Sequence, residues 1–159
     1  MPVLESHRQL INDAILSLGI DPSICQQTDA PNIWQLHRGT AQIIIAAQDS
    51  ATHLEDTVAT VSMMSPLVQL PENYEQLTAI YDYLLEKNHL LITETFSLSN
   101  RWIILSSTYY LDDMRRQEVM QLLDSLSFHA QKFGQEITEQ FELASPSTET
   151  TEQDSNEAV

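Results

Sequence analysis

The stretch from residue 119 to residue 137 restricts the fold more than any other part of the chain. Its mainly apolar side chains recur every three or four residues. At about 100° per residue in a helix, they fall within an arc of roughly 120°. The residues on this arc are Val119, Leu122, Leu123, Leu126, His129, Ala130, Phe133 and Ile137. A helix with one apolar face is stable only where that face packs on another apolar surface. The rest of the chain therefore has to provide that surface.

Five other stretches have the composition of β-strands. Residues 33–38 and 40–47 are rich in β-branched side chains and are separated by Gly39, which favours a tight connection. Residues 57–64 alternate apolar with polar positions, as a half-buried strand does, and Pro66 then interrupts the pattern. Residues 90–98 and 101–110 predict two further strands, joined by a short turn at Ser99-Asn100.

Helical spacing returns at residues 4–18 and 72–87. Gly19 favours the end of the first of these helices, and Asn88 that of the second. Asp112 or Asp113 would cap the last helix. The predicted order is α-β-β-β-α-β-β-α, an α+β domain over residues 1–143 with helices packed on an antiparallel sheet.

Residues 144–159 contain no Leu, Ile, Phe, Tyr, Trp or Met, and they carry four acids without a base. Such a segment buries too little apolar surface to offset its ordering entropy. We therefore expect a disordered acidic tail, which would be either a solubilising or regulatory arm or an unconstrained terminus.

Charge and composition exclude several classes of function. The 159 residues hold seven Lys and Arg against 23 Asp and Glu, a net charge of −16, which disfavours nucleic acid and anionic membrane surfaces as partners. Three glycines are too few for a phosphate-binding loop. A single cysteine, Cys25, allows neither a disulfide within the chain nor a multi-cysteine metal site. Without a signal-peptide pattern or a long apolar run, we expect a cytoplasmic chain with no membrane insertion.

No motif places a nucleophile beside a base. His53, Glu55 and Asp56 form the most compact group of possible metal ligands, but their spacing fits no known pattern and better suits a solvated loop. We therefore expect no catalytic residue, no metal and no cofactor. The alternative is a small-molecule-binding domain or enzyme, with a pocket between sheet and helices lined by His37, Glu94 and His129.

Several large side chains exceed what one small core can hold. Met63 and Met64 are neighbours, so they point to opposite faces of their strand, and Phe128 lies outside the apolar arc of its helix. A helix, a second subunit or a bound peptide must cover such side chains, unless they are scattered exposures. We expect contact with a protein or peptide partner, with Phe128 among the contact residues.

The order of elements, with its apolar motifs, resembles a known fold. The motifs are Ile33-Trp34, Leu84-Leu85-Glu86-Lys87-Asn88, Phe96-Ser97-Leu98, Trp102-Ile103-Ile104-Leu105 and Leu122-Leu123-Asp124-Ser125-Leu126. The chain is similar over residues 4–137 to the type III secretion chaperone-like fold and, within it, to the YbjN-type bacterial domains, regulators of sensory transduction.

The resemblance implies a small, acidic, often dimeric protein that holds another polypeptide or acts in regulation without being an enzyme. By the same resemblance, Ile80 and Tyr83 become candidate dimer residues, and Leu16, Met63 and Met64 candidate partner contacts. We therefore expect a chaperone-like or regulatory adaptor that forms a homodimer. Its acidity would favour a basic or amphipathic client. An acidic mimic that occupies nucleic-acid-binding proteins is a further possibility.

Overall fold

A computed structural model describes residues 3–54 and 56–144. It contains four helices and five strands, in the order α1 (Glu5–Ser17), α2 (Pro22–Cys25), β1 (Ile33–Arg38), β2 (Ala41–Ala51), β3 (Thr57–Gln69), α3 (Tyr74–Leu90), β4 (Thr95–Ser99), β5 (Trp102–Tyr110) and α4 (Arg116–Gln140). The strands form one antiparallel sheet in the order β1-β2-β3-β5-β4. The α+β class predicted from the sequence is confirmed, and the short helix α2 is the element that the sequence pattern missed.

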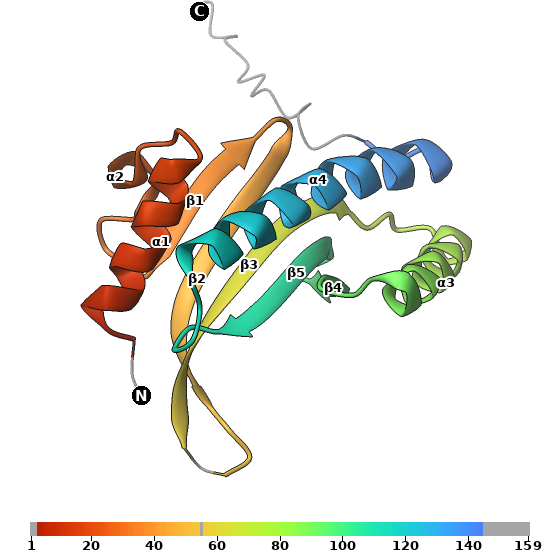
Figure 1. The fold of residues 1–159 in the computed structure, drawn as a ribbon. Coiled ribbons are helices and arrows are strands. Elements are labelled where there is room, and N and C mark those ends of the chain that lie inside the picture. Colours follow the sequence, from red (N-terminus) through yellow and green to blue (C-terminus); the bar gives the residue numbers. More distant parts are fainter. Residues whose placement is uncertain (1–2, 55, 145–159) are drawn as a thin grey trace, which may run out of the picture.

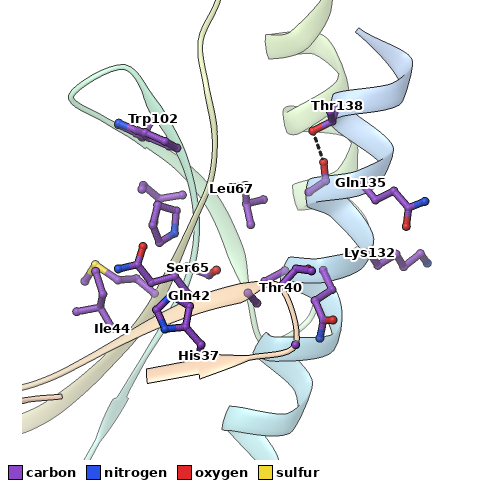
Figure 2. Close-up of a pocket in the computed structure, with 18 of the residues that line it drawn as sticks. His37, Thr40, Gln42, Ile44, Ser65, Leu67, Trp102, Lys132, Gln135 and Thr138 are labelled. Atoms are coloured by element: carbon purple, nitrogen blue, oxygen red, sulfur yellow. Dashed lines mark hydrogen bonds between the residues drawn. The ribbon is translucent and has the colours of Figure 1, made fainter. Parts of the chain in front are cut away.

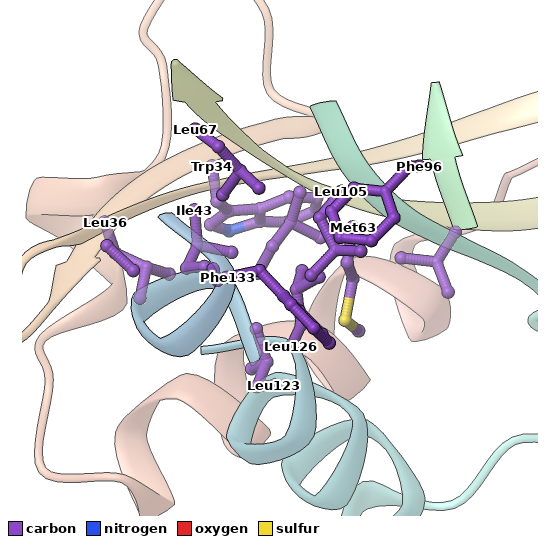
Figure 3. Packing of buried hydrophobic residues seen from close by; sticks show 14 of the residues in the cluster. Trp34, Leu36, Ile43, Met63, Leu67, Phe96, Leu105, Leu123, Leu126 and Phe133 are labelled. Carbon is purple, nitrogen blue, oxygen red and sulfur yellow. The ribbon is translucent and has the colours of Figure 1, made fainter. Parts of the chain in front are cut away.

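Helices α1 and α4 cover one face of the sheet (Figure 1). Strand alternation directs Trp34, Ile43, Met63 and Leu105 toward these helices, and all four are fully buried or nearly so (Figure 3). The apolar arc of α4 closes the same core with Leu123, Leu126 and Phe133, among others. The Trp34 indole also donates a hydrogen bond of 2.8 Å to Asn12 Oδ1 in α1. The predicted packing of the last helix on the sheet is therefore correct.

Strand β3 continues through Pro66 instead of ending before it. Its pairing with β5 shifts register between Pro66 and Val68, where a β-bulge accommodates the residue that cannot donate a backbone hydrogen bond. The strand thus runs to Gln69, five residues beyond the predicted end at residue 64. These extra residues form one side of the groove described below.

Two helix boundaries differ from prediction, one through a tertiary contact and the other through a local cap. Helix α3 continues to Leu90, and Asn88 lies within it. The Asn88 amide accepts a hydrogen bond from Phe96 N at 2.6 Å and donates one to Phe96 O at 3.1 Å, which links α3 to β4. Helix α4 begins at Arg116, and Glu118 accepts from the Arg115 N–H at 2.6 Å.

The turn between β4 and β5 lies one residue later than predicted. Asn100 and Arg101 have positive φ values of 48° and 65°, and Ser99 pairs with Trp102 across them. Two consecutive left-handed residues are typical of a type I′ hairpin turn. The Arg101 guanidinium donates to Pro71 O at 2.8 Å, which holds this turn against the end of β3. Apart from Ala144, the acidic tail expected at residues 144–159 lies outside the described residues.

We predict that Gly39→Ala and Gly19→Ala each lower the free energy of unfolding by about 1–2 kcal/mol. Both glycines have positive φ, 59° and 81°, where an L side chain costs about this much. The nearest atoms to a Cβ at Gly39 would be those at the end of the flexible Gln131 side chain, which can move away, and a Cβ at Gly19 would meet no atom within 4 Å. Urea unfolding of both variants measures the two losses, and an unchanged free energy would contradict the left-handed conformation of that glycine.

Candidate functional site

A groove lies where β2 and β3 separate (Figure 2). The pairing of β2 with β3 ends at Ile44 and Met64, whereas the pairing of β3 with β5 continues to Gln69 and Trp102. Within the described part of the chain, residues 65–69 therefore have β5 on one side and no strand on the other. The groove encloses about 1320 Å³. We call it the β3 groove.

The strands separate because the tip of the β1–β2 hairpin is held against α4. Arg38, at the end of β1, forms an ion pair with Asp124 of α4. Gly39 follows it, and the end of the Gln131 side chain of α4 lies where a Cβ at Gly39 would be. The far end of β3 is fixed instead by β5, since Leu70 N donates to Arg101 O at 2.7 Å. Two anchors on different elements thus keep the groove open.

The groove has two mouths. Toward the helices, α4 contributes Phe128, Gln131, Lys132, Gln135, Thr138 and Glu139. Thr40 lines it from the hairpin, and Ser65 and Leu67 from β3. On the opposite side of the sheet the lining residues are His37, Gln42, Ile44, Met64, Pro66, Trp102 and Ile104. Most of these side chains are neutral, so hydrogen bonding and apolar contact are the interactions that the β3 groove offers.

Gly134 lies in the middle of α4 and lines the groove. Glycine at an internal helical position costs about 1 kcal/mol relative to alanine. Close packing does not explain it here, because a Cβ at Gly134 would meet no atom within 4 Å. Ala130 and Thr138, one turn away on each side, also line the groove. This stripe of α4 leaves space that larger side chains would fill.

Ser65 is completely buried, and its hydroxyl has no hydrogen-bond partner among the described residues. It also lines the β3 groove. A buried polar group without a partner costs about 1–3 kcal/mol. Ser107 is likewise unpartnered but does not line this groove. The Ser65 hydroxyl is therefore a buried polar group beside the groove whose hydrogen bonding the described chain leaves unsatisfied.

A second polar cluster surrounds Glu94, which is only 3% exposed. Its carboxylate accepts hydrogen bonds from Ser125 Oγ at 2.5 Å and Thr93 Oγ1 at 2.7 Å, and it lies 3.3 Å from His129 Nδ1. Burial raises the pKa of Glu94, but the hydrogen bonds from Ser125, Thr93 and His129 outweigh burial and bring its pKa below the usual 4.5. Glu94 is therefore a buried carboxylate that its hydrogen bonds keep ionised at neutral pH.

The Glu94 cluster lacks the geometry of a catalytic triad. In a triad, the hydroxyl and the carboxylate contact opposite nitrogens of the histidine. Here Ser125 Oγ lies 3.5 Å from His129 Nδ1, the nitrogen that Glu94 also approaches. His37 lines the β3 groove instead, so the predicted pocket of His37, Glu94 and His129 does not form. The reason is that the side chain of His37 lies on the face of β1 that points away from the helices.

The candidate contact residues fall in different environments. Met64 and Phe128 line the β3 groove, and Phe128 is 64% exposed. Leu16 is exposed on α1 and does not line the groove. Met63 and Ile80 are fully buried, so the structure corrects their assignment as contact residues. Met63 points to the helix-covered face of the sheet, and Ile80 lies on the core side of α3.

Tyr83, the other candidate dimer residue, joins α3 to α4 within the chain. Its hydroxyl donates to Glu136 Oε2 at 2.9 Å, and its ring lies edge-on to Phe141 with centroids 5.7 Å apart. Burial and the contact with Glu136 raise the pKa of Tyr83. The exposed large apolar side chains of α3 are instead Tyr74, Tyr81, Leu85 and Leu90.

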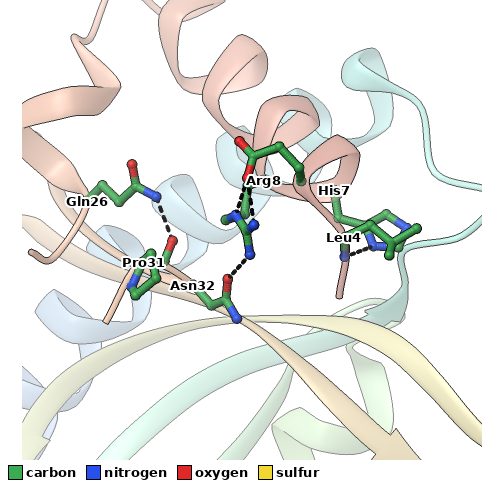
Figure 4. Close-up of polar contacts among 7 residues, drawn as sticks. Leu4, His7, Arg8, Gln26, Pro31 and Asn32 are labelled. Atoms are coloured by element: carbon green, nitrogen blue, oxygen red, sulfur yellow. Dashed lines mark hydrogen bonds and ion pairs between the residues drawn. The ribbon is translucent and has the colours of Figure 1, made fainter. Parts of the chain in front are cut away.

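Polar contacts at the start of α1 have a structural role (Figure 4). His7 Nδ1 accepts from Leu4 N at 3.0 Å, and His7 Nε2 lies 3.3 Å from Asp112 Oδ1. Arg8 bonds to Asn32 Oδ1 at 3.0 Å. Asp112, expected to cap α4, thus holds the first helix instead. These contacts fix α1 to the loop before β1 and to the loop before α4.

The other candidate groups form neither a reactive thiolate nor a metal site among the described residues. Cys25 is buried, and burial raises the pKa of its thiol, so the reactive thiolate is disfavoured. Glu55 lies outside the described residues, and elsewhere in the described chain no three His, Cys, Asp or Glu side chains are placed to share a metal ion. Of the helices described, none has the length and apolar character needed to cross a membrane.

Comparison of the chain with protein-family models and with curated protein sequences gives no match. The resemblance to secretion chaperone-like and YbjN-type domains therefore remains an expectation from the sequence.

We predict that Glu94→Gln lowers the free energy of unfolding by about 1.5–3 kcal/mol at pH 7, because it weakens hydrogen bonds to a buried charge. The pKa of Glu94 in the folded chain lies below its unfolded value, so its stabilising contribution is complete above pH 4.5 and is lost as the pH falls through the folded pKa. The difference between wild type and variant should therefore shrink in acid. Urea unfolding from pH 7 to pH 3 tests this, with exposed Glu86→Gln as the control. A constant difference would contradict the ionised state of Glu94.

Proposed function

We propose that this chain is a non-enzymatic binding module that holds an extended segment of a partner polypeptide in the β3 groove. The observation that carries the proposal is the edge of β3 over residues 65–69, which has no strand partner on the side of β2 among residues 3–54 and 56–144. A chaperone-like or regulatory adaptor would use such an edge to hold its client.

The exposed edge of a strand binds a polypeptide by strand addition. The backbone N–H and C=O groups of the incoming segment pair with those of the edge, and alternate side chains enter pockets on the two sides. Pro66 offers no N–H, so the pairing would use its carbonyl and the neighbouring residues.

The volume of the groove also favours a peptide. Sites for drug-sized ligands usually enclose about 300–1,000 Å³. The β3 groove, at about 1320 Å³, is larger and open at two mouths, as an extended segment requires. Side chains of that segment would alternate between Gln131 and Gln135 on the helix side and Met64 and Ile104 on the other.

Charge indicates the chemistry of the partner. His37, Lys132 and Glu139 are the titratable residues among those that line the groove, so the segment inside it should be mainly uncharged. The net charge is −16, and without the four acids of residues 144–159 it is still −12. Basic residues flanking the bound segment would be attracted by this surface and would bind faster at low salt.

The proposal is tested with peptides selected from a random display library on the wild-type chain. We expect the selected peptides to alternate apolar with small or polar residues, and to slow amide hydrogen exchange at residues 65–69. In Gly134→Leu the added side chain fills the open space against α4, so the Kd of these peptides should rise at least tenfold while the fold is retained.

Gln121→Leu is the matched control, because this exposed residue of α4 does not line the groove. Peptide affinity in this variant should equal that of the wild type. If the selected peptides bind Gly134→Leu as tightly as wild type, or if no peptide protects residues 65–69, the β3 groove does not hold the client and the proposal is wrong.

A further inference from the structure

Helix α3 lies beside β4, at the edge of the sheet (Figure 1). Its inner side joins the core through the buried residues Ile80 and Leu84. A second apolar row lies on its outer side, where Tyr74, Tyr81 and Leu85 are exposed. At about 100° per residue, these three side chains fall within an arc of about 40°. A helix that only covers a core needs one apolar side, so the outer row calls for a partner of its own.

An acidic row runs beside this apolar row. Each of the three exposed apolar residues is followed directly by an exposed acid, namely Glu75, Asp82 and Glu86. The helical repeat therefore places these acids in a line of their own, about 100° around the helix from the apolar row. Within the described part of the chain, none of the three forms an ion pair. We call the two rows together the α3 face.

The sheet lies on the other flank of the apolar row. At about 100° per residue, Asn88 falls on the side of the row that is opposite to the acids. Its amide bonds to the backbone of Phe96 in β4, so this flank of the helix faces the sheet edge. Anything that rests on the apolar row therefore has the sheet on one side and three carboxylates on the other.

Charge selects the occupant of the α3 face. Helices pack on one another through apolar side chains, with their axes about 8–10 Å apart. Lys or Arg on one flank of a bound helix would lie next to Glu75, Asp82 and Glu86, and this complementarity favours both encounter and orientation. A second copy of this chain would instead bring another acidic row, and like charges repel. The matching partner is thus an amphipathic helix with one basic flank.

We infer that the α3 face binds such a helix of a partner protein. The apolar row from Tyr74 to Leu85 spans about 16 Å at 1.5 Å per residue, so the bound helix needs about three turns. Among the described residues, none from α3 lines the β3 groove. The α3 face is therefore a second docking surface, which goes beyond the proposed peptide binding and does not require it.

A designed peptide tests the inference on the full chain. The peptide has about 18 residues, with Leu at positions i, i+4, i+7 and i+11 and Lys along one flank of that row. A scrambled peptide of the same composition keeps its charge but not its apolar row. Fluorescence anisotropy should show binding of the helical peptide and at least tenfold weaker binding of the scrambled one. Leu85→Arg should raise the Kd of the helical peptide at least tenfold, because it places a like charge in the apolar row.

Charge reversal tests the acidic row. Asp82→Lys/Glu86→Lys should raise the Kd of the helical peptide at least tenfold, and a peptide with Glu in place of Lys should bind this variant more tightly than it binds wild type. Asp29→Lys/Asp113→Lys is the matched control, because it changes the net charge equally at exposed residues outside α3. Its Kd should differ from that of wild type by less than threefold.

Gly134→Leu, which fills the β3 groove, should bind the helical peptide as wild type does, so the two docking surfaces are tested separately. If the helical peptide does not bind at 100 µM, or if the control double variant weakens it as much as the α3 double variant, the inference is wrong. A dimer in sedimentation equilibrium that Leu85→Arg dissociates would also overturn it, because a second copy would then occupy the α3 face.

Discussion

Helix α4 supplies the apolar cover that the inner face of the sheet requires, and every other feature depends on how it lies there. Leu123, Leu126 and Phe133 close the core over β3 and β5. The same helix fixes the tip of the β1–β2 hairpin through the ion pair of Asp124 with Arg38. One element therefore stabilises the sheet along most of its length and separates two of its strands at one end.

The groove that results leaves favourable interactions unmade. Within the described residues, β3 has no strand partner on the side of β2 over residues 65–69, the Ser65 hydroxyl is buried without a hydrogen-bond partner, and Gly134 weakens the interior of α4. Each of these costs folding free energy that a closed sheet with a larger residue at 134 would recover. Costs that coincide at one place are typical of a binding site, because an occupant can offset them.

Charge on the surface indicates how a partner would approach. The five strands contain one acidic residue, Asp49, and the other acids of the described chain lie on helices and loops. The side chains that line the β3 groove are mostly neutral. The acidic surface therefore favours basic residues that flank the bound segment, and the groove itself favours an uncharged segment.

The local pattern of the sequence determined the class of the fold, most element positions and the faces of the last helix, because periods of 3.6 and 2 residues fix which side chains share a surface. Strand alternation separates Met63 from Met64, but which of them is covered depended on where α4 packs. Tertiary structure alone decided that β2 pairs with β3 only from Ile44 onward, since Arg38 meets Asp124 across 86 positions of the chain. It also turned Asn88 from a helix end into a link with Phe96 and assembled the cluster around Glu94. A periodicity reports only neighbours within a few residues, whereas a groove is made by segments that meet only after the chain has folded.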